Sequence, residues 1–117
     1  MPGEATRNKL RQPVTIESFG PGGFRVGGLW RPGSLLVLAD VPQSWPPTAI
    51  AEVTMDDLVE FLLLGTGAAQ ALPPQPVRAA FAAARIGLEF MATEAAAREH
   101  NVLSGQGRLF ATALIAI

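Results

Sequence analysis

A Gly-Thr-Gly triplet, Gly65 to Gly67, directly follows the aliphatic run FLLL, where a phosphate-binding loop would first be sought. The dinucleotide-binding fingerprint requires a third glycine three residues on and a helix that opens there, because the helix N-terminus meets the pyrophosphate. Gln70 stands at that third position, and the next helical pattern begins only at Pro76. Nucleotide binding at this triplet is therefore disfavoured.

The same triplet leaves two other interpretations open. Loops that follow the carboxyl ends of strands form the crevice of open α/β sheets, and glycine lets backbone N–H groups face that edge. Gly65 and Gly67, with the polar side chains of Thr66 and Gln70, could hold a small anion or the carboxylate of a partner protein. A plain turn at the end of a strand explains the same residues with fewer assumptions.

A helical pattern over residues 93–107 carries the other polar candidates. Thr93 is predicted to cap this helix, and Arg98 and Asn101 lie three residues apart on one face. These two side chains either bind a ligand beside the Gly-Thr-Gly loop or brace loops through backbone carbonyls, and bracing is the simpler interpretation. His100 and Ser104 could touch, but Ser104 lacks an exposed elbow and an oxyanion hole, so a Ser-His hydrolase is disfavoured.

The residue inventory excludes several kinds of chemistry. The chain has no cysteine and a single histidine, His100, which excludes thiolate catalysis and the usual zinc sites within one chain. Asp56 and Asp57 are the closest acidic pair, and neighbours on a helix diverge too far to grip one ion. A formal net charge of −1 provides no basic face for nucleic acid. We therefore expect no metal, no cofactor and no nucleic acid.

The composition fits one globular domain, because 49% of the 117 residues are hydrophobic and 16% are charged. Residues 1–13 are expected to be a disordered polar tail, and residues 14–117 a single α/β domain. The start of the chain lacks the apolar core of a signal peptide. The apolar stretch LFATALIAI is shorter than the roughly 20 residues of a membrane helix. A cytoplasmic protein without membrane insertion is expected.

Strands and helices are expected to alternate along most of the chain, which predicts an α/β fold with a central mixed sheet of about five or six strands. The first two strands flank a Pro-Gly-Gly turn and form an N-terminal β-hairpin at one edge of that sheet. A loop is expected over residues 40–47. The strands are expected over residues 14–20, 24–30, 34–40, 61–65, 88–92 and 108–117. The helices are expected from Thr54, over residues 76–86 and over residues 93–107.

Four segments taken together resemble one known family: SFGPGGFRVGG, FLLLGTG followed by Gln70 and Pro73, MATEAAAREHNVL, and RLFATALIAI. It is a domain-of-unknown-function family that includes mitochondrial complex I assembly factor three and uncharacterised bacterial and archaeal members. The resemblance covers nearly all of residues 14–117. It implies a three-layer α/β domain with a central mixed sheet of about five strands.

The resemblance supplies recurrent positions but no established catalytic residue. Where relatives usually read Arg-Thr-Tyr-Asn, this chain has Arg98-Glu99-His100-Asn101, so a site that depends on the tyrosine hydroxyl would be altered. The recurrent positions that match are Gly20, Gly22, Gly23, Phe24, Gly65, Thr66, Gly67, Thr93, Arg98 and Asn101.

In the eukaryotic branch, the resemblance implies a role in assembling the respiratory NADH:ubiquinone oxidoreductase through protein contacts. Because the sequence offers no candidate nucleophile or metal site, we predict a non-enzymatic protein-binding protein whose partners are subunits of that complex. The alternative is a binder of a small anionic ligand, or an enzyme, that uses the Gly-Thr-Gly crevice. A third possibility is a homo-oligomeric scaffold. The site residues of the alternative would be Gly65, Thr66, Gly67, Gln70, Thr93, Arg98 and Asn101.

Overall fold

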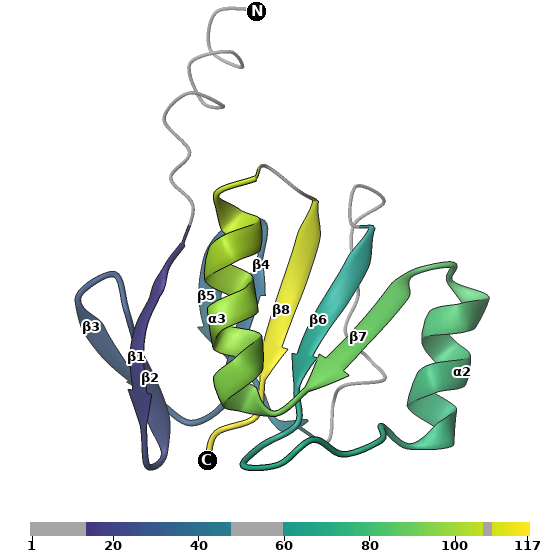
Figure 1. Cartoon of the computed structure of the whole chain (residues 1–117), viewed down its shortest axis with the longest axis horizontal. Coiled ribbons are helices and arrows are strands. Elements are labelled where there is room, and N and C mark those ends of the chain that lie inside the picture. Colours follow the sequence, from purple (N-terminus) through teal and green to yellow (C-terminus); the bar gives the residue numbers. More distant parts are fainter. Residues whose placement is uncertain (1–13, 48–59, 107–108) are drawn as a thin grey trace, which may run out of the picture.

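The computed structural model describes residues 14–47, 60–106 and 109–117, which form one five-stranded sheet, a separate three-stranded sheet and two helices (Figure 1). The strands of the small sheet are β1 (Ile16–Gly20), β2 (Gly23–Val26) and β3 (Leu29–Pro32). The strands of the large sheet are β4 (Leu35–Leu38), β5 (Val41–Ser44), β6 (Phe61–Gly65), β7 (Gly87–Met91) and β8 (Phe110–Leu114). The helices are α2 (Gln75–Ala83) and α3 (Thr93–Ser104).

The large sheet is mixed, with the strand order β5-β4-β8-β6-β7. Strand β6 pairs in parallel with β7 and β8, whereas β4 pairs antiparallel with β8 and β5. The carboxyl ends of β6, β7 and β8 therefore meet at one edge of the sheet, at the bottom of Figure 1. The predicted α/β class with a central mixed sheet of about five or six strands is confirmed.

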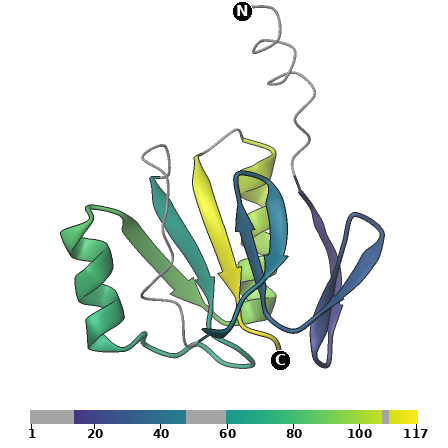
Figure 2. The ribbon, with the colours of Figure 1, turned by 180° about the vertical axis from the view of Figure 1, so that it is seen from behind.

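Side chains of the large sheet alternate between two cores. Phe61 and Leu63 face α3 and the small sheet, in a core that also holds Ala96 and Leu103 of the helix. Leu62 and Leu64 face the opposite way and pack in a second core with Val77 and Phe81 of α2. Helix α3 crosses the front of the sheet in Figure 1, and Figure 2 shows the reverse side. Because both faces are covered, the central strands read as continuous aliphatic runs.

The small sheet differs from the predicted N-terminal hairpin in two ways. The expected second strand over residues 24–30 is two strands, β2 and β3, separated by Gly27 and Gly28. Both glycines have positive φ, +59° and +80°, which is the conformation of a tight hairpin turn. The three strands also form a sheet of their own rather than extending the edge of the large one.

Three other expectations need correction or lie outside the structure. The loop expected over residues 40–47 contains β5, which can pair with β4 because Ala39 and Asp40 turn the chain with φ of +51° and +63°. Helix α2 ends at Ala83, earlier than predicted. The helix expected from Thr54 lies outside the described residues.

The two helices of the described part have 9 and 12 residues, and neither is long and apolar enough to cross a membrane.

Candidate functional site

The Gly-Thr-Gly loop leaves the carboxyl end of β6 and is folded back by hydrogen bonds of Thr66. The Thr66 backbone N–H donates to the carbonyl oxygen of Met91 at 2.8 Å, which continues the pairing of β6 with β7. The Thr66 hydroxyl lies 2.8 Å from the carbonyl oxygen of Ala69 and accepts the N–H of Ala71 at 3.1 Å. Thr66 therefore closes the loop on itself.

Thr93 joins three segments of the chain at this edge. Its hydroxyl accepts the N–H of Gly67 at 2.9 Å and donates to the carbonyl oxygen of Ile115 at 2.8 Å. Its own N–H donates to the carbonyl oxygen of Gly67 at 2.8 Å. Because Thr93 is completely buried, these three bonds hold the end of β6, the start of α3 and the end of β8 together without competition from water.

The predicted capping role of Thr93 is wrong. The N-cap residue of α3 is Ala92, which makes no side-chain cap, and Thr93 occupies the first helical position. Its hydroxyl is already used by Gly67 and Ile115, so it does not turn toward the helix N–H groups.

Gly65 has no room for a side chain. A β-carbon built at this position would lie 2.9 Å from the Cα of Thr93, from its hydroxyl and from a methyl group of Leu114. The Gly65 carbonyl oxygen accepts the N–H of Ile115 at 3.0 Å. The first glycine of the triplet thus allows α3 to approach the sheet edge closely, and the second, Gly67, adopts a φ of +106° that favours glycine.

The structure brings five of the seven predicted site residues together at this edge. Gln70 contributes a long, exposed contact of 3.5 Å from its side-chain amide to the carbonyl oxygen of Phe90. The N–H groups of Thr66 and Gly67, which an anion would need, both donate within the chain. The five are Gly65, Thr66, Gly67, Gln70 and Thr93.

Arg98 and Asn101 lie further along α3. Arg98 is about one and a half turns from Thr93, and Asn101 is a little more than two turns from it. Asn101 accepts the N–H of Ile16 and donates to its carbonyl oxygen, each at 2.9 Å, so one amide pins β1 to the helix. Arg98 is exposed and pairs with Glu94 at 2.8 Å. Asn101 makes the backbone contact that the bracing interpretation requires, and ligand binding by the seven residues stays a prediction.

His100 of α3 is buried against β8 and the segment that precedes β1. Its Nε2 lies 2.6 Å from the carbonyl oxygen of Val14, which only accepts, so Nε2 carries the proton of the neutral ring. Its Nδ1 then accepts from the hydroxyl of Thr112 at 2.7 Å. Burial lowers the pKa of His100, opposed by the hydrogen bond to Val14 and by the charge of Asp40.

This arrangement predicts a loss of stability in mild acid. The unfolded chain protonates His100 near pH 6.5, whereas the folded chain resists protonation because its pKa is lower. Stability from this residue is complete above pH 6.5 and is lost as the pH falls below it, at up to about 1.4 kcal/mol per pH unit. Urea unfolding between pH 7.5 and 5 measures the slope.

His100→Gln is the control, because glutamine can still donate to Val14 and accept from Thr112 but does not titrate. His100 is the only histidine of the chain, so no other side chain ordinarily titrates in this range. The same slope in wild type and His100→Gln would contradict the prediction.

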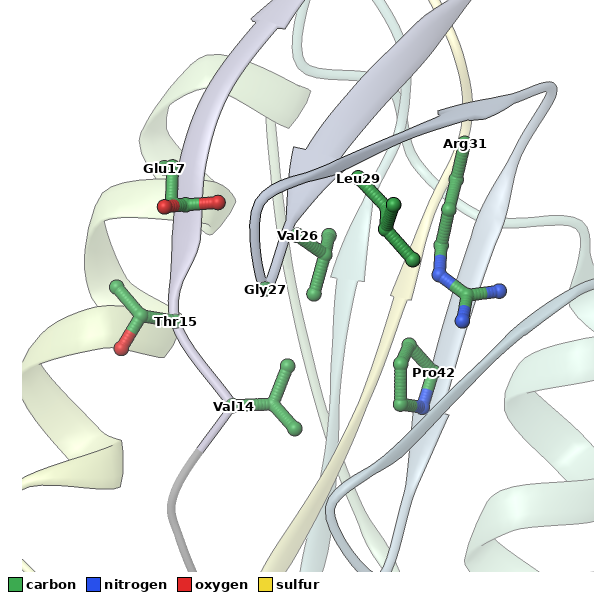
Figure 3. Close-up of a pocket in the computed structure, with 8 residues that line it drawn as sticks. All are labelled: Val14, Thr15, Glu17, Val26, Gly27, Leu29, Arg31 and Pro42. Carbon is green, nitrogen blue, oxygen red and sulfur yellow. The ribbon is translucent and has the colours of Figure 1, made fainter.

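A cavity that the sequence did not reveal lies between the small sheet and β5 (Figure 3). Its volume is about 480 Å³. Arg31 of β3 points its guanidinium into it, beside Leu29 and Pro42. The available signal was the alternation of β3: Arg31 pairs with the buried Phe24 and so shares the inner face of the sheet, while Trp30 faces outward with Arg25.

Comparison with known proteins places this fold among uncharacterised bacterial proteins. An uncharacterised protein of Rhodobacter capsulatus is 34% identical over 104 residues, which span 87% of this chain and 84% of the relative. A crystal structure from Bordetella parapertussis matches with a TM-score of 0.77 and 28% identity, over 92% of this chain and 99% of that one.

A crystal structure described as an outer membrane protein of Bartonella henselae matches with a TM-score of 0.78 and 28% identity, over 91% and 97% of the two chains. A Bordetella pertussis solution structure described as a Mth938-like domain matches with a TM-score of 0.68 and 27% identity, over 87% and 85%. Residues 16–115 match the family described as protein of unknown function (DUF498/DUF598), which confirms the predicted kind of family, and the chain belongs to it.

Proposed function

We propose that this chain is a non-catalytic protein-binding protein, and that its partner docks on the outer face of the small sheet around Trp30. The observation that carries the proposal is the exposure of this tryptophan, which leaves 44% of its surface accessible on an edge strand. Partly exposed tryptophan is a frequent anchor of protein interfaces, because it buries a large rigid area when a partner covers it.

Glycines hold the Trp30 ring in place. A β-carbon at Gly23 would lie 2.7 Å from the ring, and one at Gly20 would lie 3.7 Å from it, so the ring rests on backbone that carries no side chain. Phe19 pairs with the buried Phe24 and so lies on the other face of the sheet. We name Trp30, with Gly20 and Gly23 under its ring, the Trp30 surface. Its platform is rigid before any partner arrives, which lowers the entropic cost of docking.

The Gly-Thr-Gly edge also supports a binding role over a catalytic one. The Thr93 hydroxyl accepts a hydrogen bond from Gly67 and donates one to Ile115, and these bonds join β6, α3 and β8. This hydroxyl therefore already has both a donor and an acceptor partner. A small anion at this edge, the alternative function, would have to displace the bond between Gly67 and Thr93. That alternative stays a prediction, as does the homo-oligomeric scaffold.

The family resemblance makes subunits of the respiratory NADH:ubiquinone oxidoreductase the partners to test first, with this chain acting in the cytoplasm during assembly. Affinity capture from cells of the source organism is expected to recover such subunits. Trp30→Ser should reduce the recovery by about tenfold or more, because loss of a tryptophan anchor commonly costs over 2 kcal/mol of binding.

Val102→Ser is the matched control, since Val102 is an apolar residue of α3 that is 56% exposed and is not part of the Trp30 surface. Recovery of the same subunits with Trp30→Ser and wild type would refute the Trp30 surface, and failure to recover any would refute the assembly role. Light scattering of both variants separates these outcomes from self-association.

A further inference from the structure

The cavity between the small sheet and β5 has an apolar wall and one basic group. In Figure 3, Val26 and Leu29 point into it from the small sheet, Val14 points into it from the segment before β1, and Pro42 closes it from β5. A volume of about 480 Å³ lies in the range of small-molecule sites, which are mostly apolar with a few placed polar groups. The cavity is distinct from both the Gly-Thr-Gly edge and the outward-facing Trp30 surface.

Arg31 is the basic side chain among the residues that line this cavity. Its Nε is shielded from solvent and has no hydrogen-bond partner, and no carboxylate of residues 14–47, 60–106 or 109–117 forms an ion pair with it. A shielded N–H donor without an acceptor is unfavourable, because it loses its water without gaining a hydrogen bond. An acceptor that entered the cavity would remove that cost.

We propose that this cavity binds a small organic monocarboxylate, with its carboxylate on Arg31 and its apolar body against Val14, Val26 and Leu29. A planar carboxylate can accept from Nε and a terminal nitrogen of one guanidinium together, which is the strongest neutralisation available to arginine. This binding activity goes beyond the proposed protein-binding function and does not depend on it.

A single negative charge is favoured by Glu17, which also lines the cavity. Figure 3 places Glu17 on β1, across the cavity from Arg31. Its carboxylate accepts the N–H of Gly28 at 2.6 Å, which keeps it at the rim. A phosphate dianion or a dicarboxylate would bring a second negative charge into a cavity where Glu17 is already negative. A monocarboxylate bound to Arg31 instead turns its uncharged end toward Glu17.

The experiment uses hexanoate as the probe, followed by ¹⁵N NMR of the full chain. Saturable shifts are expected at the backbone amides of Gly27, Leu29 and Arg31 and at the Arg31 Nε–H. Hexanamide, the uncharged isostere, and inorganic phosphate are each expected to bind about tenfold more weakly or not at all. Equal binding of hexanamide, equal binding of phosphate, or no shift with hexanoate would overturn the proposal.

Arg31→Gln is expected to weaken hexanoate binding about tenfold or more, and Arg31→Lys, which keeps the charge but loses the two-pronged geometry, by a smaller factor. Arg25→Gln is the matched control, because Arg25 lies on the opposite face of the same sheet and its guanidinium donates to the carbonyl oxygen of Gly28. Unchanged affinity in Arg31→Gln and Arg31→Lys, or equal loss in Arg25→Gln, would also overturn it. If Arg31→Gln did not fold, Arg31→Lys would carry the same test.

Discussion

Thr93→Val is expected to lower the free energy of unfolding by about 2–4 kcal/mol. Valine has nearly the shape of threonine, so the change removes the hydroxyl without opening a cavity. The Gly67 N–H and the Ile115 carbonyl oxygen then lose their partners at 2.9 and 2.8 Å, beside a residue that water does not reach. Each buried polar group left unpaired costs roughly 1–3 kcal/mol. Urea unfolding measures the loss from the midpoint at an unchanged slope.

Thr93→Ser separates the hydroxyl from the packing of the methyl group. Serine retains both hydrogen bonds and removes one buried methyl, which is expected to cost about 1 kcal/mol. If Thr93→Val were no less stable than Thr93→Ser, the hydroxyl would not hold the three segments together.

The sequence predicted those elements whose pattern is local. The run FLLL became β6 because an aliphatic stretch of this length, ended by glycine, fits a strand covered on both faces. Helix α3 was predictable because Ala96, His100 and Leu103 recur with helical spacing on its buried face. Its start at Thr93 was also correct, although the reason given for it was not.

The errors arose where pairing between distant segments decides the structure. Strand β5 is short, exposed and contains Pro42, so its own residues favour a loop, and only its pairing with β4 makes it a strand. One error was of another kind, because the split between β2 and β3 had a local signal. A glycine pair between apolar residues, here Gly27-Gly28, is typical of a tight hairpin.

The candidate site follows the same division. The residues of the Gly-Thr-Gly edge were identified from sequence, but their hydrogen bonds were not. Thr93 bonds to Gly67 and Ile115, which lie 26 and 22 positions away in the sequence. Asn101 likewise binds Ile16 across 85 positions. Spacing along one helix showed that Arg98 and Asn101 share a face. It did not show that Asn101 faces a backbone segment while Arg98 faces Glu94 in solvent.

Gly65→Ala is expected to destabilise the fold by about 3 kcal/mol, at the upper end of overpacking costs. The added methyl group would lie 2.9 Å from the Cα of Thr93, which is backbone and cannot rotate away, and equally close to the Thr93 hydroxyl and Leu114. Relief requires the start of α3 to move off the sheet edge, which would stretch the hydrogen bonds between Thr93 and Gly67. Thermal and urea unfolding measure the change.

Gly105→Ala is the matched control for the loss of a glycine. Gly105 ends α3 with a φ of −74°, which alanine adopts freely, and the nearest atom to an added β-carbon is the Val102 carbonyl oxygen at an ordinary 3.7 Å. Alanine reduces the conformational freedom of the unfolded chain. The free energy of unfolding of this variant is therefore expected to equal that of the wild type or to be higher by up to about 0.5 kcal/mol. Equal stability of Gly65→Ala and Gly105→Ala would mean that α3 can retreat freely. The close approach of α3 to the carboxyl edge would then not be the reason for glycine at position 65.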